Sequence, residues 1–366
     1  MHVVDRTSVQ VYFAQAKSSI HVPPRSGIDP DVVDWILTNE DIRFLDPNNS
    51  NHIEVVRNDL KSSGKDLTPE SVVLHLSYLK DSLRRDESDS WDELAARAHE
   101  LDVFTNVHHN FLVPDSRFLE FSGSDVTSLD PSLFGPKGII ENVVAMTRLT
   151  ETRVQDGFTR YSPKPVPQLV GFERMWGHSK QEGSWLPAYR AYGEGILFQF
   201  NVARLSNWLA SAGLKEDPQE IRRGLSAYGI LAHSLAHLMM TRLSNECGYA
   251  LPSIQDRLYD LPDGRVAVLV YTTDSDILGT LGGLVDFATG EKLESLVRGA
   301  FEEARWCSQD PVCISREVNP TDKQGSCCHQ CLFLPETSCE LRNQYLDRAT
   351  LVGSSERNIA GVLTTM

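Results

Sequence analysis

Cysteine is the residue type in this chain whose spacing most clearly predicts chemistry. Six of the seven cysteines lie between Cys307 and Cys339. Cys328 and Cys331 form a C-x2-C pair, a spacing that lets two thiolates bind one ion. Clustered cysteines in a cytosolic protein of this size indicate a metal site rather than disulfides. The sequence therefore predicts a closed four-thiolate zinc site, which stabilises the fold and leaves no coordination position for catalysis.

The ligand set of this zinc site has alternatives at the level of sequence. Cys328 and Cys331 are its firm members, and Cys339 is the expected third ligand. Cys307 or Cys313 completes the set, and these two cannot both bind if Cys339 does, because a tetrahedral ion takes four ligands. The other interpretations are an iron–sulfur cluster, which also binds four thiolates, and reduced cysteines with a packing role only.

A histidine pair forms a second candidate site. His233 and His237 are four residues apart in an apolar stretch that predicts a helix, so both imidazoles lie on one helix face. Glu246 is a candidate third ligand, and the three residues together would suit a metal-dependent hydrolase or nuclease. Ser234 stands where the zinc-protease motif has its glutamate. Because the neighbouring residues are apolar, we expect both histidines to be buried and hydrogen-bonded rather than metal-bound.

Several predicted elements must position these residues. Residues 226–247 are the longest helix candidate, and Gly248 is suited to end it. The apolar composition of residues 194–200 predicts a buried strand, and residues 257–272 predict a hairpin. An amphipathic helix at 291–306 leads directly into the cysteines.

The composition divides the chain into two regions. The pattern of residues 1–124 predicts a mostly helical region. A stretch at 122–138, rich in glycine, proline and serine, is typical of a linker. Residues 139–366 then form a second domain, with the zinc site at 307–339. The predicted fold class is α+β, or mixed α/β: a helical N-terminal region, followed by a mixed-sheet domain that carries a C-terminal zinc-binding module.

Net charge limits the partners that this chain can bind by itself. The charge is −15 and the pI about 5.2, so bulk charge does not favour nucleic acid. The best local basic patch spans residues 139–180, where Arg148, Arg153 and Arg160 are candidate nucleic-acid contacts. The alternative is an ordinary solvated surface whose arginines pair with nearby acids. We expect a partner to supply most of the phosphate contacts.

Apolar segments give no indication of a membrane partner. No run approaches the roughly 18 apolar residues of a membrane span. The first residues have neither the basic start nor the apolar core of a signal peptide. The expected location is therefore the cytoplasm.

Several motifs of the second region resemble those of the DrmB family. Arg148-Leu-Thr-Glu-Thr-Arg-Val-Gln-Asp-Gly-Phe-Thr-Arg160 is similar to its RLxExRxxxGFTR segment, and residues 194–200 resemble its next strand. Residues 231–238, Leu-Ala-His-Ser-Leu-Ala-His-Leu, resemble its LHTLAHLL helix. The remaining matches are the GTLGGL loop at 279–284 and the cysteine segments at 306–313 and 328–340. The matches run in order from about residue 142 to Gly353.

This resemblance implies a role in DISARM, a bacterial defence system against phage. The family shares its C-terminal domain with MrfA-type DNA-repair helicases, where the cysteines resemble a zinc site. The resemblance implies structural Zn²⁺ as the cofactor and a helicase partner, DrmA, that acts on DNA within a protein complex. It implies no enzymatic activity for this subunit, so we assign no catalytic residues.

The N-terminal region departs from the family pattern. Family members are longer, and residues 9–13 and 18–24 resemble an internal segment of theirs. We expect either that a separate polypeptide supplies the N-terminal half that those members have, or that this system works without it. The leading hypothesis is a non-catalytic, zinc-bearing subunit that supports DNA engagement by a helicase. The alternatives are the hydrolase or nuclease described above and an assembly scaffold that never contacts DNA, which metal content and DNA binding would distinguish.

Overall fold

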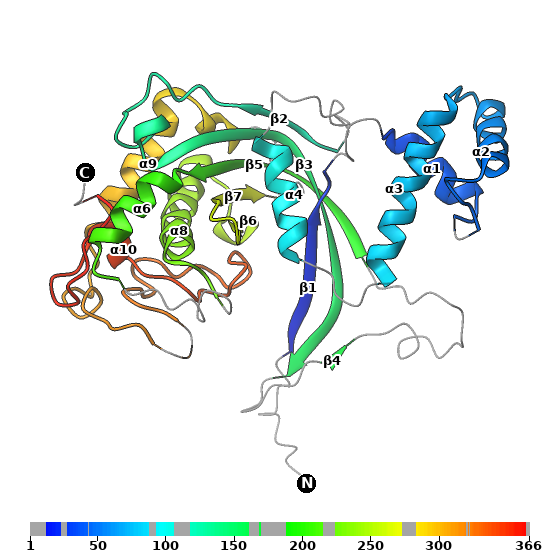
Figure 1. The fold of residues 1–366 in the computed structure, drawn as a ribbon. Coiled ribbons are helices and arrows are strands. Elements are labelled where there is room, and N and C mark those ends of the chain that lie inside the picture. The colour runs from blue at the N-terminus through cyan, green and yellow to red at the C-terminus, as the bar shows by residue number, and fades with distance from the viewer. Residues whose placement is uncertain are drawn as a thin grey trace, which may run out of the picture.

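In a computed structural model of the chain, the described residues are 12–22, 28–42, 44–87, 93–105, 118–160, 168–169, 188–214, 224–272, 283–319, 321 and 323–363. They form one curled antiparallel sheet with helices on both of its faces and a helical lobe at one end (Figure 1).

The sheet is organised around one long strand, β3 (Ile140–Arg160). The strand order is β1-β3-β5-β7-β6, and β2 and β4 also pair with β3. Every pairing between these strands is antiparallel. The other strands are β1 (Tyr12–Ile20), β2 (Glu120–Gly123), β4 (Gln168–Leu169), β5 (Ala188–Phe200), β6 (Ile254–Asp260) and β7 (Val266–Thr272).

Strand β7 shows why the sheet is covered on both faces. All of its residues are buried, and successive side chains of a strand point to opposite faces. Val266, Val268 and Val270 belong to one hydrophobic core, whereas Leu269 and Tyr271 belong to a second. The continuous apolar run at 266–271 therefore contributes to two cores at once.

The larger core holds the helix that carries the histidine pair, α8 (Ala227–Cys247). Its N-cap is Ser226, whose hydroxyl accepts a hydrogen bond from the Gly229 N–H, and Asp260 of β6 accepts from both polar groups of Ser226. Gly248 ends the helix with a φ of 76°, the left-handed conformation that glycine adopts without strain. Helices α6 (Val202–Ser211) and α9 (Gly290–Ala304) contribute to the same core.

The N-terminal helices serve two different cores. Helices α1 (Pro30–Asn39), α2 (Ser50–Ser62) and α3 (Pro69–Glu87) pack around a core of their own. Helix α4 (Glu93–Thr105) instead covers the second face of the sheet, where Leu101 and Phe104 meet Ile20 of β1. Figure 1 shows α1 to α3 set apart from the sheet and α4 lying across it.

The cysteine-bearing segment lies between α9 and α10 (Ala349–Val352). Its described residues, within 305–348, form turns and loops without a helix or a strand. Figure 1 shows this part of the chain in orange to red, wrapped around one end of α8. A segment of this kind gains few backbone hydrogen bonds from regular structure, so side chains must hold it in place.

The structure confirms the predicted α+β class, and α8, β5, the β6–β7 hairpin and α9 lie where the sequence indicates. The predicted division into residues 1–124 and 139–366 stays a prediction, although β1 pairs with β3 across it. Short connecting turns of 3₁₀ type occur at Gly135–Lys137, Leu251–Ser253 and Val285–Ala288. Among the described helices, none has both the length and the apolar character that crossing a bilayer requires.

Candidate metal centres

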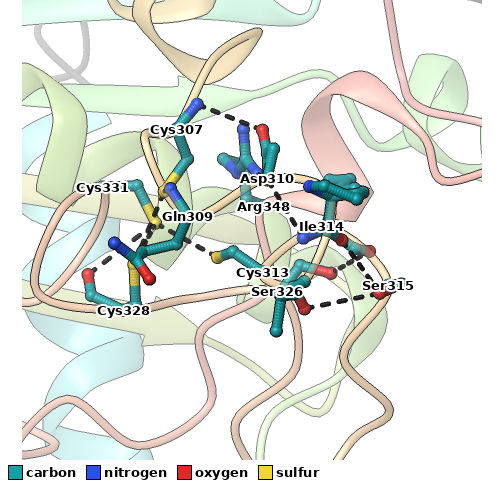
Figure 2. Close-up of polar contacts among 12 residues, drawn as sticks. Cys307, Gln309, Asp310, Cys313, Ile314, Ser315, Ser326, Cys328, Cys331 and Arg348 are labelled. Atoms are coloured by element: carbon teal, nitrogen blue, oxygen red, sulfur yellow. Dashed lines mark hydrogen bonds and ion pairs between the residues drawn. The ribbon is translucent and has the colours of Figure 1, made fainter.

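Four cysteines of the C-terminal segment converge on one point. The sulfur atoms of Cys307, Cys313, Cys328 and Cys331 all lie within 4.8 Å of one another. Figure 2 shows the four side chains pointing toward a common centre. Cys307 and Cys313 are almost fully buried, whereas Cys328 and Cys331 are half-buried. This group can therefore hold a metal ion at the edge of the core.

The spacing of the sulfur atoms fits a single tetrahedral ion. The Sγ–Sγ distance is 3.5 Å between Cys307 and Cys328, 3.8 Å between Cys313 and Cys331, and 3.7 Å between Cys328 and Cys331. A tetrahedron of four sulfur atoms around one zinc, with bonds of about 2.3 Å, has edges of about 3.8 Å. In an iron–sulfur cluster the four thiolates are divided among two or four irons, so they do not all surround one ion at this spacing.

Backbone amides support the sulfur atoms on both sides of the site. The Gln309 N–H donates to the Cys307 Sγ and the Gln330 N–H donates to the Cys328 Sγ, each at 3.4 Å. In both cases the donor is two residues beyond the cysteine. These N–H groups stabilise negative charge on the sulfur atoms, as a metal-bound thiolate requires.

An ion pair between the buried Arg348 and the half-buried Asp310 fixes the first loop of the site. The Asp310 carboxylate accepts hydrogen bonds from the backbone N–H groups of Cys307 and Ile314, each at 3.1 Å. The Arg348 guanidinium pairs with Asp310 and also donates to the Ala304 carbonyl at the end of α9, at 3.0 Å. Arg348 therefore ties the loop that carries Cys307 and Cys313 to the preceding helix (Figure 2).

The pKa values of two of these thiols, Cys313 and Cys331, are raised, so these two resist ionisation beside their neighbours. Burial raises the pKa of Cys313 to about 12, and the neighbouring Cys328 thiolate adds to the shift. The pKa of Cys331 is raised for the same two kinds of reason, burial first and the nearby sulfur atoms second. For Cys328 burial acts upward, but the hydrogen bonds it accepts outweigh burial and lower the pKa. A divalent cation would remove this mutual repulsion between thiolates.

The structure thus brings together four of the five predicted ligands and places Cys339 elsewhere. Two hydrogen bonds to β6 hold its loop there: the Asp256 N–H donates to the Ser338 carbonyl at 3.1 Å, and the Glu340 N–H donates to the Asp256 carboxylate at 2.7 Å. Cys313 joins the cluster because a helical turn, with the Cys313 N–H donating to the Gln309 carbonyl, shortens its separation from Cys307. Cys327 and His329 lie outside the group.

Cys339 lies beside the histidine pair instead. Its sulfur is 3.2 Å from the His233 Nε2, and both histidines are fully buried, as the apolar neighbours predicted. Burial alone would lower the pKa of His233, but the Asp256 carboxylate and the Cys339 sulfur outweigh it and raise that pKa to about 10. Sequence reasoning missed Asp256, whose signal is an acidic residue at an inward-facing position of the β6 hairpin strand.

Glu246, the third member of the hydrolase hypothesis, is not near the histidines. It lies nine residues beyond His237 on α8, which is about 13 Å along the helix axis. Its side chain is exposed and pairs with Arg242 at 3.8 Å.

The three arginines of the basic patch differ in their surroundings, although all lie on β3. Arg148 is exposed to solvent. Arg153 is paired with the buried Glu151, with 2.8 Å between Nε and the carboxylate, and also contacts Gln255. Arg160 is the last residue of β3, and its side chain, like the rest of the patch between 161 and 180 apart from 168–169, lies outside what the structure describes.

Comparison with known proteins adds one relative. No family model matches the chain. The chain is 34% identical over 228 residues to the DISARM protein DrmB of Bacillus paralicheniformis. The chain is related to DrmB. The match covers 57% of this chain and 40% of that protein, so the chain spans less than half the length of the curated relative it matches. This similarity confirms the resemblance to the DrmB family that the motifs carry.

Proposed function

We propose that this DrmB-related chain is a non-catalytic, zinc-bearing subunit of a DISARM-type defence complex against phage, acting in the cytoplasm. The similarity to the DISARM protein DrmB is the observation that carries the proposal. The four-cysteine group supports the structural part of it.

Zinc is the proposed cofactor, with Cys307, Cys313, Cys328 and Cys331 as its ligands. Four thiolates suit zinc and fill its tetrahedral coordination, so no position remains for a substrate or a reacting water. The ion would join the loop after α9 to the loop before α10, in a segment with little regular structure. Its role is therefore to fold this segment, which supports the non-catalytic assignment.

A helicase is the proposed partner, and the subunit is proposed to engage DNA through the resulting complex. The charge of −15 disfavours contact with phosphates by the isolated chain. Arg148 is exposed on β3, and it is the described arginine of the patch that we propose contacts a phosphate.

The proposal is tested by purifying the chain alone and together with a co-expressed DISARM helicase, and titrating both with DNA at about 150 mM salt. We expect co-purification with the helicase, weak binding by the isolated chain and tighter binding by the complex than by the helicase alone. Tight, strongly salt-dependent binding by the isolated chain would contradict the partner-dependent mechanism. Failure to co-purify, with no change in phage plating when the gene is deleted, would contradict the defence role.

The competing hypothesis of a hydrolase or nuclease has its own test. The purified chain is incubated with DNA and with Mg²⁺, Mn²⁺ or added Zn²⁺, and cleavage is measured. We expect either no cleavage or cleavage that persists in the His237→Ala variant. Cleavage that depends on His237 would favour the enzyme.

A further inference from the structure

Four buried polar groups from three parts of the fold meet beneath the sheet. They are His233 and His237 of α8, Asp256 of β6 and Cys339 of the C-terminal segment, and their ligand atoms lie within 4.8 Å of one another. All four residues are at most 4% exposed. A carboxylate, two imidazoles and a thiol so far from water must be paired or must bind an ion.

The backbone fixes which nitrogen of each histidine faces the centre. The His233 Nδ1 lies 3.2 Å from the Tyr345 carbonyl, and the His237 Nδ1 lies 2.7 Å from the Leu332 carbonyl. A carbonyl only accepts, so each Nδ1 carries the hydrogen and donates it. In the neutral ring the Nε2 lone pair is then available, and both Nε2 atoms point at Asp256 and Cys339. A histidine that donates its other N–H to a backbone carbonyl is the usual form of a metal ligand.

The contacts at the centre are close but poorly aligned as hydrogen bonds. The Asp256 Oδ2 is 3.1 Å from the His233 Nε2 and 3.3 Å from the His237 Nε2. Nevertheless, neither the Asp256 Oδ2 nor the His237 Nε2 has a hydrogen-bond partner, although both atoms are buried. Unpartnered buried polar atoms are rare. Atoms aimed at a common point between them, rather than at one another, are expected when that point is an ion.

The donor set and its spacing match one divalent ion. Asp256 and a Cys339 thiolate together carry a charge of −2, which one divalent cation balances while both imidazoles stay neutral. Bonds of about 2.0 Å to nitrogen and oxygen give tetrahedral edges of about 3.3 Å, close to the distances above. The second Asp256 oxygen accepts from the Glu340 N–H at 2.7 Å, which leaves one oxygen for the ion. The Asn343 N–H donates to the Cys339 sulfur at 3.2 Å and stabilises the thiolate.

We propose that His233, His237, Asp256 and Cys339 form a second metal site, separate from the four-cysteine site, that holds one structural Zn²⁺. The ion joins α8, β6 and the C-terminal segment, and its four ligands complete a tetrahedron. Asp256 and Cys339 also take part in lining a pocket of about 690 Å³. The proposal goes beyond the defence role and does not depend on it.

A catalytic thiol is the other chemistry that these residue types suggest, and the geometry does not favour it. In a thiol–imidazole–carboxylate triad the two imidazole nitrogens face different partners, the nucleophile and the carboxylate. Here the same atom, the His233 Nε2, lies near both Cys339 and Asp256, and its Nδ1 is engaged by a backbone carbonyl. Cys339 is also almost fully buried, out of reach of a substrate.

X-ray absorption on the zinc-loaded full chain tests the proposal without any variant. One four-cysteine site and one His–His–Asp–Cys site together average about 2.5 sulfur and 1.5 nitrogen or oxygen ligands per zinc, and metal analysis gives about two zinc ions per chain. Four sulfur ligands per zinc, with about one zinc per chain, would overturn the second site.

A substitution then assigns the second ion to its ligands. Asp256→Asn keeps the side-chain shape but removes the charge, so we expect zinc to fall to about one per chain, with only sulfur ligands in the absorption spectrum. Asp263→Asn, an exposed carboxylate in the turn after the same strand, is the control and is expected to retain both ions. Retention of two zinc ions by Asp256→Asn would overturn the ligand assignment. If that variant does not fold, the absorption spectrum of the unmodified chain decides.

Discussion

The two ligand clusters are linked by the hydrogen bond from His237 to the carbonyl of Leu332, the residue after Cys331, but they are assembled from different lengths of chain. The four-cysteine group comes from one stretch between Cys307 and Cys331, in two adjoining loops. The His–Asp–Cys group comes from a helix, a strand and a loop, and its His233 and Cys339 are 106 residues apart. The first group can form around an ion with little of the rest of the fold, whereas the second requires the sheet and α8 to be in place.

The clusters also differ in how their charge is balanced. Four thiolates and one Zn²⁺ leave a net charge of −2, next to the buried guanidinium of Arg348. Burial lowers the pKa of Arg348, but Asp310 first, and then Cys331 and Cys313, raise it above its usual value. Asp256, Cys339 and one Zn²⁺ are neutral together. The cysteine group therefore relies on surrounding cations and N–H donors, and the His–Asp–Cys group relies on its position in the core.

The largest expected effect comes from removing a thiolate of the cysteine group. Cys331→Ser should yield insoluble or protease-sensitive protein, because structural zinc contributes about 10–16 kcal/mol of apparent binding free energy that is also folding free energy. Limited proteolysis and zinc content measure this. Cys327→Ala, the fully buried neighbour outside the cluster, should keep its zinc. If Cys331→Ser keeps the unmodified melting temperature without zinc, the structural role is wrong.

A smaller effect is expected from a change at Glu100. Of the two clusters, only the His–Asp–Cys group should lose metal faster. This carboxylate on α4 pairs with Arg257 of β6 at 2.7 Å, and both side chains are buried. Glu100→Gln leaves a buried charge without its partner and should lower the free energy of unfolding by about 3–5 kcal/mol.

Urea unfolding and chelator challenge check this second prediction. Since β6 carries Asp256, the variant should lose metal from the His–Asp–Cys group faster, with the cysteine group unchanged. Glu93→Gln on the same helix, where the carboxylate is 63% exposed, is the control and should cost at most about 1 kcal/mol. Equal loss of metal from both clusters would show that they are not independent.

The support of the cysteine group by Asp310 gives a third prediction. Asp310→Asn weakens the hydrogen bonds to the backbone of Cys307 and Ile314 and the ion pair with Arg348. We expect zinc affinity at this site to fall about 10–100-fold, which competition with a chelator measures. Glu302→Gln, an exposed carboxylate on α9, should leave the affinity unchanged. An unchanged affinity in Asp310→Asn would mean that the loop is fixed by the ion alone.

The smallest effect is expected on DNA binding, which involves the ligands of neither cluster. Arg148→Glu should lower the salt slope of DNA binding by the complex by an amount that corresponds to about one phosphate contact. The variant should still bind its helicase partner. Salt titration of DNA binding measures the slope. Lys61→Glu on α2 is the control for a charge reversal on an exposed helix. An unchanged slope with Arg148→Glu would remove this arginine from the proposed interface.

Sequence reasoning succeeded where the signal is local. The C-x2-C pair, the helix with His233 and His237, and its Gly248 cap all depend on residues a few positions apart, and the structure has them close together. For Cys339, sequence proximity to Cys331 suggested a shared ion, whereas hydrogen bonds between its loop and β6 hold it beside the histidine pair.

Asp256 could not be predicted as a partner of the histidines for a related reason. Its approach to α8 depends on the pairing of β6 with β7 and on the packing of α8 against both strands, which are long-range interactions. The β1–β3 pairing, which joins the N-terminal region to the sheet, depends on equally distant residues.

The distance along the chain between His233 and Cys339 also has a consequence in time. At a synthesis rate of about 5–20 residues per second, α8 emerges from the ribosome roughly 5–20 s before Cys339 does. During that interval the emerged chain carries both imidazoles and, once Asp256 follows, the carboxylate, but not the thiol that completes the set. The arrival of Cys339 therefore marks the point in translation at which this part of the core can first close.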